Sequence, residues 1–219
     1  MRELRFARNG AARGKARSLV VFLHGYGANG ADLLGLGDVL ADHLPGTAFV
    51  APDAPEPCAV APGMRQWFGL PAYDGSSEAE ARDGLMASAR DLDAFLDARL
   101  ADEGLDASAM ALFGFSQGAM MSLHVAPRRA APVAGVVACS GRLLLPELLA
   151  REMRAKPPVL LMHGDQDVVV PFSDMADAQR ALTAAGFSVS THVMRGSGHG
   201  IAPDGLGAAL GFLRAHLPP

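Results

Sequence analysis

The sequence has 219 residues and is poor in cysteine, in aromatic side chains and in long apolar runs. Its two cysteines, Cys58 and Cys139, belong to different segments, and no CxxC pair occurs, which argues against a cysteine-based zinc site. None of the seven histidines forms an HExxH motif, so we expect no metal and no other cofactor. In a reducing compartment both cysteines are expected to be free thiols.

Signals for membranes and export are also missing. No apolar run approaches the roughly 18 residues that a membrane-spanning helix needs. The N-terminus alternates arginine with apolar residues and lacks the apolar core of a signal peptide. We therefore expect a soluble chain in the cytoplasm.

Basic residues are concentrated at the N-terminus. Residues 1–17 carry six basic side chains and one acidic one, whereas the remaining residues carry 13 basic and 22 acidic ones. An acidic body repels nucleic acid, because neutralised phosphates supply most of that affinity. A nucleic-acid arm or a transit peptide would also be basic, but Gly10 and Gly14 favour an exposed first strand and its turn.

The length and composition predict one globular domain over residues 1–219. Half of the residues are apolar and 19% are charged, which excludes a disordered chain or a coiled coil. A domain of this length buries roughly 70% of its unfolded surface and needs no disulfide or metal to fold.

Short apolar runs alternate with helical segments along the chain. The runs lack a polar face, as is typical of a parallel sheet covered on both sides; they lie at residues 19–24, 47–51, 110–115, 133–138 and 159–163, and a more alternating one lies at 188–194. Helices are expected at about 31–42, 117–126, 146–154, 173–185 and 205–216. This order predicts an α/β fold whose central sheet is mostly parallel and flanked by helices on both faces.

The segment after the second of these runs differs from the other connections. Residues 52–77 contain five prolines and the only tryptophan, Trp67, and a connection this long is usually functional or mobile. A helix of about 25 residues is expected next, with a capping box formed by Ser77 and Glu80 at its start and Gly104 at its end.

A G-x-S-x-G motif at residues 114–118 links a predicted strand to a predicted helix. This turn projects the Ser116 hydroxyl above the carboxyl edge of the sheet and aims the first amides of the helix at the same point. Because of that context we interpret Ser116 as a nucleophile rather than as a structural turn residue.

A serine nucleophile needs a base and an acid, which follow it in this order of motifs. Among the downstream histidines we favour His199, which lies in a glycine-rich loop, over His163 and His192, which lie in predicted strands. Asp165 and Asp167 both follow the strand at 159–163, and the pattern alone does not choose between them.

The glycine-rich segment 24–30 follows an early strand, where the second oxyanion donor of such a site is expected. A phosphate-binding loop would also be glycine-rich. However, no G-x-x-x-x-G-K pattern is present, which argues against nucleotide binding.

Four motifs in this order resemble the phospholipase/carboxylesterase family of α/β-hydrolases, which includes the acyl-protein thioesterases. They are LHGYGANG, GFSQGAMMSL, HGDQDVVVP and GSGHGI, and the resemblance covers nearly the whole chain. It implies Ser116 as nucleophile, His199 as base and Asp167 as acid, with the backbone amides of Leu23 and Gln117 as oxyanion donors.

The family's W-[FY] pair matches Trp67-Phe68, so the resemblance places an acyl pocket near this pair. We expect Met64, Trp67, Phe68 and Leu70 to line it, although each could equally pack the loop onto the body. Two positions depart from the family pattern. Ala119 replaces a glycine that often follows SQG, and Gly69 replaces an aspartate that often follows the aromatic pair.

These observations predict a serine carboxylesterase that hydrolyses short- to medium-chain esters through an acyl-enzyme on Ser116. The same residues would serve an acyl-protein thioesterase or lysophospholipase, and a non-catalytic binding domain on a hydrolase scaffold is the alternative of another class. A peptidase is disfavoured because no acidic specificity element is identifiable. The expected partner is a small acyl ester or thioester, and since family members often form dimers, a homodimer is also considered.

Overall fold

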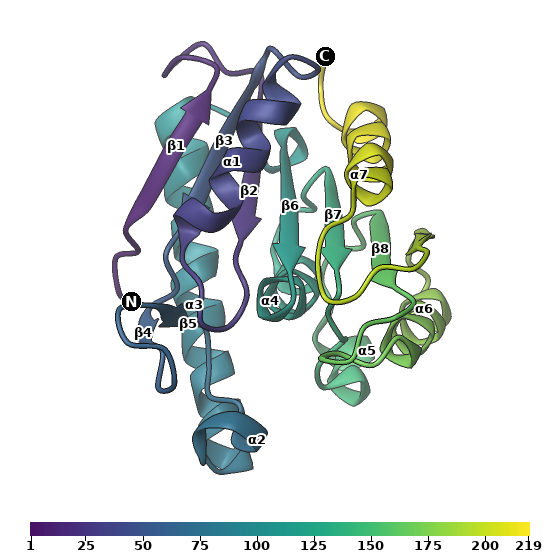
Figure 1. Cartoon of the computed structure of the whole chain (residues 1–219). Helices are drawn as coiled ribbons and strands as arrows, with labels where there is room; N and C mark the ends of the chain where they lie inside the picture. The colour runs from purple at the N-terminus through teal and green to yellow at the C-terminus, as the bar shows by residue number, and fades with distance from the viewer.

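The computed structural model describes residues 1–219 and contains a seven-stranded sheet with helices on both faces (Figure 1). Its strands are β1 (Phe6–Gly10), β2 (Ser18–Leu23), β3 (Thr47–Pro52), β6 (Met110–Phe115), β7 (Gly135–Cys139), β8 (Val159–Gly164) and β9 (Val189–Met194). They lie in the order β1-β3-β2-β6-β7-β8-β9, and only β1 runs antiparallel to its neighbour. The predicted α/β fold with a mostly parallel sheet is confirmed.

Helices cover the two faces because the side chains of each strand alternate. In β2, Leu19 and Val21 belong to one core and Val20 and Phe22 to the other. The first core includes side chains of α3 (Glu78–Glu103), α4 (Gln117–Val125), α5 (Pro146–Glu152) and α6 (Ser173–Ala184). The second is covered by α1 (Gly30–Ala41) and α7 (Pro203–His216), which lie in front of the sheet in Figure 1.

Local sequence signals set the ends of α3. The Ser77 hydroxyl accepts a hydrogen bond from the Glu80 amide, and the Glu80 carboxylate accepts one from the Ser77 amide. These two hydrogen bonds form the predicted capping box. At the other end Gly104 adopts φ 66°, a left-handed conformation that glycine reaches without a Cβ clash. The predicted start and end of this helix are therefore confirmed.

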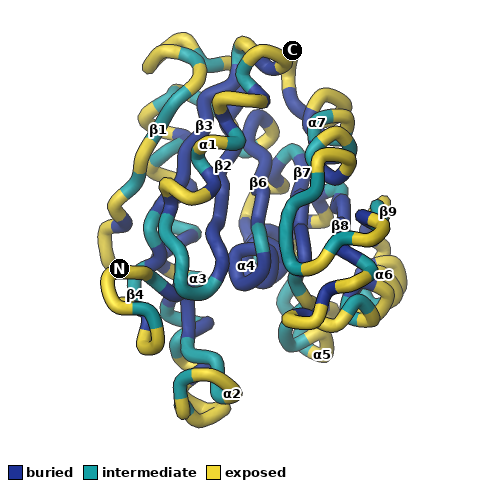
Figure 2. The backbone as a smooth tube through the Cα atoms, viewed as in Figure 1, coloured by how far each residue is buried: buried dark blue, intermediate teal, exposed yellow.

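The connection 52–77 contains short elements of its own. A small hairpin joins β4 (Glu56–Pro57) to β5 (Arg65–Gln66), and α2 (Pro71–Asp74) follows. Figure 2 shows α2 as an exposed projection beyond the lower end of α3. These short elements were not expected from the sequence.

The strand order creates a crevice at the carboxyl edge of the sheet. The chain passes from β2 through α1 to β3 on one side, and then through α3 to β6 on the other side of β2. At such a reversal the two connections leave in opposite directions, which opens a crevice above the strand ends. The segments after β2 and β6 both begin there.

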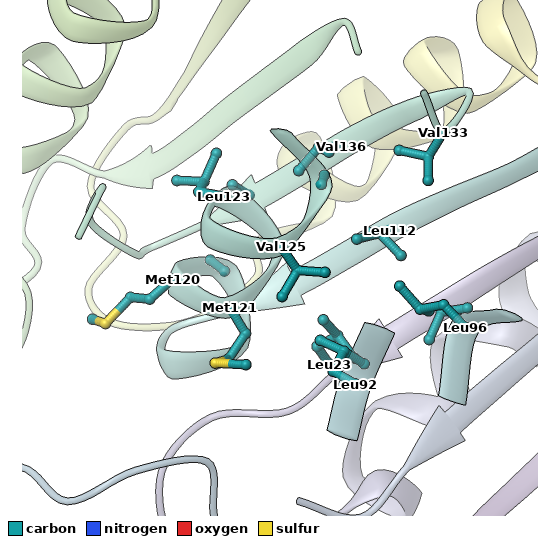
Figure 3. Close-up of a cluster of buried hydrophobic side chains, with 14 of the residues drawn as sticks. Leu23, Leu92, Leu96, Leu112, Met120, Met121, Leu123, Val125, Val133 and Val136 are labelled. Carbon is teal, nitrogen blue, oxygen red and sulfur yellow. The ribbon is translucent and has the colours of Figure 1, made fainter. Parts of the chain in front are cut away.

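Helix α4 lies at the centre of the larger core. All nine of its residues are buried, and it appears as the dark segment beneath β6 in Figure 2. Figure 3 shows Met121 and Val125 directed toward Leu92 and Leu23, whereas Met120 points to another side of the helix. No helix combines the length and hydropathy required to span a bilayer.

Candidate active site

The turn between β6 and α4 places Ser116 in a conformation that non-glycine residues rarely adopt, with φ 54° and ψ −117°. Its neighbours must be small. A Cβ on Gly114 would lie 2.3 Å from the Gly118 carbonyl oxygen, and a Cβ on Gly118 would lie 1.9 Å from the Leu23 carbonyl oxygen. The two glycines of the motif therefore allow the bend that presents the serine hydroxyl.

Ser116, His199 and Asp167 form a hydrogen-bonded chain from three separate loops. The Ser116 hydroxyl lies 3.0 Å from Nε2 of His199, and Nδ1 of His199 lies 2.8 Å from Oδ2 of Asp167. Because an ionised carboxylate only accepts hydrogen bonds, Nδ1 carries the proton and leaves Nε2 free to accept from the hydroxyl. This geometry suits proton transfer from Ser116 to His199.

The surroundings of Asp167 keep its carboxylate ionised. Burial alone would raise its pKa, but the hydrogen bonds from His199 and from the Val170 and Val169 amides outweigh burial and hold the pKa below its ordinary value. Both amides donate to Oδ1 at 2.9 Å, which leaves Oδ2 for the imidazole.

The other sequence candidates make different contacts, although Nε2 of His163 also lies 3.3 Å from Oδ2 of Asp167. Asp165 accepts from the Gly196 amide at 2.7 Å and so connects the acid turn to the His199 loop. His163 donates from Nε2 to the Val170 carbonyl at 3.0 Å within the acid turn. His192, on β9, lies 2.8 Å from Asp204. None of these side chains hydrogen-bonds to Ser116.

The backbone amides of Gln117, at the start of α4, and of Tyr26, after β2, have no hydrogen-bond partner within the chain. Both residues line the cavity that contains Ser116. Leu23 does not, because it is the last residue of β2, fully buried and paired with Gly114 of β6. The resemblance places the second oxyanion donor at Leu23, whereas in this segment Tyr26 is the residue that lines the cavity and whose amide has no partner.

The connection 52–77 holds in place the loop after β2 that contains Tyr26. The Trp67 indole donates to the His24 carbonyl at 3.0 Å, and the Gly27 amide donates to the Arg65 carbonyl at 3.0 Å. On its far side the Tyr26 hydroxyl donates to Asp74 at 3.1 Å. Three contacts thus join this loop to the connection 52–77.

A cavity of about 670 Å³ opens above Ser116 and His199. Of the predicted pocket residues, Phe68 and Leu70 line it. Trp67 and Met64 do not, and their assignment is corrected. Trp67 is fully buried behind the cavity wall, and its amide donates to the Gln117 side chain at 2.8 Å. Met64 lies in the hairpin, where its sulfur contacts the Asn29 amide group at 3.5 Å.

The sequence matches the phospholipase/carboxylesterase family over residues 9–217. The chain belongs to this family. Among similar proteins, acyl-protein thioesterase 1 of Saccharomyces cerevisiae is 29% identical over 222 residues, covering 92% of this chain and 94% of that protein. Esterase YpfH of Escherichia coli is 29% identical over 204 residues, covering 93% and 84%. The crystal structure of esterase PE8 superposes with a TM-score of 0.92 at 43% identity, covering 98% of this chain and all of that one.

The two departures from the pattern of the phospholipase/carboxylesterase family have local explanations. A Cβ on Gly141 would lie 2.6 Å from the Ala119 Cβ, so the extra methyl of Ala119 is accommodated because residue 141 has no side chain. A Cβ on Gly69 would lie 2.6 Å from the Ser76 hydroxyl oxygen, so the turn after α2 leaves no room for a larger residue there.

Most of the residues that line this cavity were not predicted from the sequence. It comes from α3, α4, the segment before α5 and the acid turn, namely Ala81, Leu85, Met120, Leu144, Leu145, Val169, Val170 and Pro171. The only sequence signal for these residues was their proximity to the motifs. A larger cavity of about 850 Å³ lies beside the N-terminal segment, and none of the predicted site residues lines it.

Proposed function

We propose that this protein is a serine carboxylesterase that hydrolyses short- to medium-chain carboxylic esters through an acyl-enzyme on Ser116. The proposal rests on one observation, the continuous hydrogen-bonded path from the Ser116 hydroxyl through His199 to Asp167 at the wall of a largely apolar cavity. Family membership and the likeness to esterases support it.

In the first half of the reaction, the Ser116 oxygen attacks the ester carbonyl carbon while its proton passes to Nε2 of His199. The carbonyl π pair moves onto oxygen, and we assign the backbone amides of Tyr26 and Gln117 to stabilise this oxyanion. The tetrahedral intermediate then collapses, the bond to the alkoxide breaks, and the imidazolium gives the alkoxide its proton. Asp167 keeps Nδ1 protonated and stabilises the imidazolium.

In the second half, water repeats these steps on the acyl-enzyme. The water oxygen attacks the carbonyl carbon while His199 takes a proton from the water. Collapse of the second intermediate breaks the acyl bond to Ser116, which recovers its proton from the imidazolium. The carboxylic acid leaves, and no cofactor is required for either half.

Substitution and labelling of Ser116 test the proposal. Ser116→Ala is expected to lower kcat by about 10⁴- to 10⁶-fold, as in serine-hydrolase triads. A fluorophosphonate probe should label the wild-type protein on Ser116 and leave the variant unlabelled. A variant that keeps a tenth of the activity would remove Ser116 from the mechanism, and an unlabelled wild type would favour the non-catalytic binding domain.

A thioesterase function with the same residues is the second candidate. It is favoured by the likeness to acyl-protein thioesterase 1 of S. cerevisiae, and lysophospholipid esters are a further class. Thiolates leave more readily than alkoxides, so the same steps apply. Rates on p-nitrophenyl esters of graded acyl length, compared with thioesters of the same acids, distinguish these functions.

We also propose a cytoplasmic location, which the two free thiols Cys58 and Cys139 support because reducing compartments keep thiols unpaired. A homodimer remains a prediction, and light scattering on the purified protein would measure its mass.

A further inference from the structure

Two arginines line the cavity above Ser116 from different elements. Arg82 comes from α3 and Arg142 from the segment that follows β7. The remaining wall is largely apolar, so these guanidinium groups are unusual in it. Neither belongs to the chain of residues that carries out the proposed reaction.

The position of Arg142 is set by the nucleophile turn itself. A Cβ on the preceding residue, Gly141, would lie only 3.0 Å from the Ser116 carbonyl oxygen. Since successive Cα atoms are about 3.8 Å apart, Arg142 begins beside the turn that carries Ser116. Its Nε lies 3.0 Å from Asp174 of α6, and the outer nitrogens of its guanidinium group have no hydrogen-bond partner in the chain.

Arg82 reaches the cavity from a regular face of α3. Glu78, Ala81, Arg82 and Leu85 all line the cavity, and their spacing of three and four residues places them on one side of the helix. Arg82 is exposed and forms no ion pair. Glu78 is the only carboxylate that lines the cavity, and no ion pair joins it to either arginine.

Guanidinium groups therefore line a cavity in a protein that is acidic as a whole. The protein carries a formal net charge of −4, and its basic excess is confined to residues 1–17. Two guanidinium groups and one carboxylate nevertheless line the cavity, and Asp174, which pairs with Arg142, lies outside the lining. Guanidinium groups with free N–H donors bind carboxylate and phosphate oxygens through charge-assisted hydrogen bonds.

We propose that Arg82 and Arg142 form an anion subsite, so that the preferred substrates are acyl esters or thioesters that carry a carboxylate or phosphate group away from the scissile bond. This inference rests on the proposed esterase function and specifies its substrate class. The apolar wall, which includes Leu85, Met120 and Leu144, contacts the hydrocarbon part of the substrate. The two arginines bind the charged end near the cavity mouth.

Matched ester pairs test this subsite. On the acyl side, mono-p-nitrophenyl adipate is compared with its methyl ester, and on the alcohol side 4-carboxyphenyl butyrate is compared with 4-carbamoylphenyl butyrate. The measurement is the ratio of kcat/KM for the charged member to that for the neutral member, after subtraction of spontaneous hydrolysis. The pair whose ratio responds to the arginines identifies the part of the substrate that carries the anion.

The expected result is a ratio that falls by about tenfold in Arg142→Gln and by a smaller factor in Arg82→Gln, as loss of a charge-assisted hydrogen bond predicts. The ratio should also fall with rising salt, because exposed charges are screened. Arg90→Gln is the matched control, since Arg90 is exposed on the same helix but does not line the cavity. Unchanged ratios for both esters in both variants would overturn the proposal.

Binding measured without turnover separates this inference from the proposed reaction. In the Ser116→Ala background, calorimetry gives the Kd of mono-p-nitrophenyl adipate with and without Arg142→Gln. A Kd that rises about tenfold supports the subsite even where wild-type protein hydrolyses no ester, and an unchanged Kd refutes the subsite even where hydrolysis is fast.

Discussion

Oδ2 of Asp167 lies 2.8 Å from Nδ1 of His199, whereas Asp165, two residues earlier, accepts from the Gly196 amide. The two carboxylates share one turn but face different partners. One faces the imidazole beside Ser116, and the other connects the acid turn to the loop that carries this imidazole. This difference predicts different consequences for two otherwise identical substitutions.

Asp167→Asn is expected to lower kcat by about 10³- to 10⁴-fold, because an amide at this position no longer favours the tautomer with a free Nε2. Asp165→Asn is the matched control and should cost less than about tenfold, since only one amide hydrogen bond is weakened. Steady-state kinetics on a p-nitrophenyl ester measure both. A larger loss in Asp165→Asn would reverse the assignment of the acid.

Tyr26→Phe should lower kcat by about 5- to 30-fold with a smaller change in KM, because it removes a hydrogen bond to the charged Asp74 that holds the loop with the proposed oxyanion donor. Tyr73→Phe is the control, since the Tyr73 ring lies 6.4 Å from that of Tyr26 but is 58% exposed and makes no side-chain hydrogen bond. Equal kinetics for the two variants would show that the contact has no effect on the loop.

The buried His124 on α4 predicts acid-sensitive stability. Burial, followed by the positive charge of Arg128, lowers its pKa from 6.5 to about 4. As pH falls, His124 therefore becomes protonated in the unfolded chain at a higher pH than in the folded protein. The stability that neutral His124 allows is complete above pH 6.5 and is lost as pH falls toward 4. The loss is at most about 3 kcal/mol in the free energy of unfolding. Burial also lowers the pKa of His24, which acts in the same direction.

Urea unfolding at pH 7, 5.5 and 4.5 measures this effect. Because leucine does not titrate, His124→Leu should show a shallower fall in the free energy of unfolding over this range than the wild type. Parallel curves for the two proteins would mean that His124 is not responsible for the fall.

Gly118→Ala should prevent the native turn from forming, because its methyl would lie 1.9 Å from the Leu23 carbonyl oxygen. We expect loss of folded protein, or a displaced α4 with strongly reduced activity. Gly207→Ala in α7 is the opposite control, since a Cβ there meets nothing within 4 Å, and it should raise stability by about 1 kcal/mol. Thermal unfolding and kcat of both variants provide the comparison, and a Gly118→Ala protein with native stability would contradict the steric argument.

The sequence was sufficient where the signal is local. The strand run at 110–115, the ends of α3 and the bend around Ser116 follow from burial, capping and glycine geometry within a few residues. Strands and helices of the predicted types lie within about two residues of their expected ends. Ser116, Asp167 and His199 could be recognised from the sequence because each lies in a short local motif.

Tertiary structure decided everything that depends on distances between segments. Tyr26 lines the cavity with Ser116 and Leu23 does not, because β2 ends at Leu23 and the chain then turns over the sheet edge. Both Trp67 and Phe68 are buried, but only Phe68 lines the cavity, and the Gln117 side chain holds the backbone of both residues. No sequence pattern encodes these contacts, since a cavity wall collects single residues from many elements whose order in space is set by sheet packing.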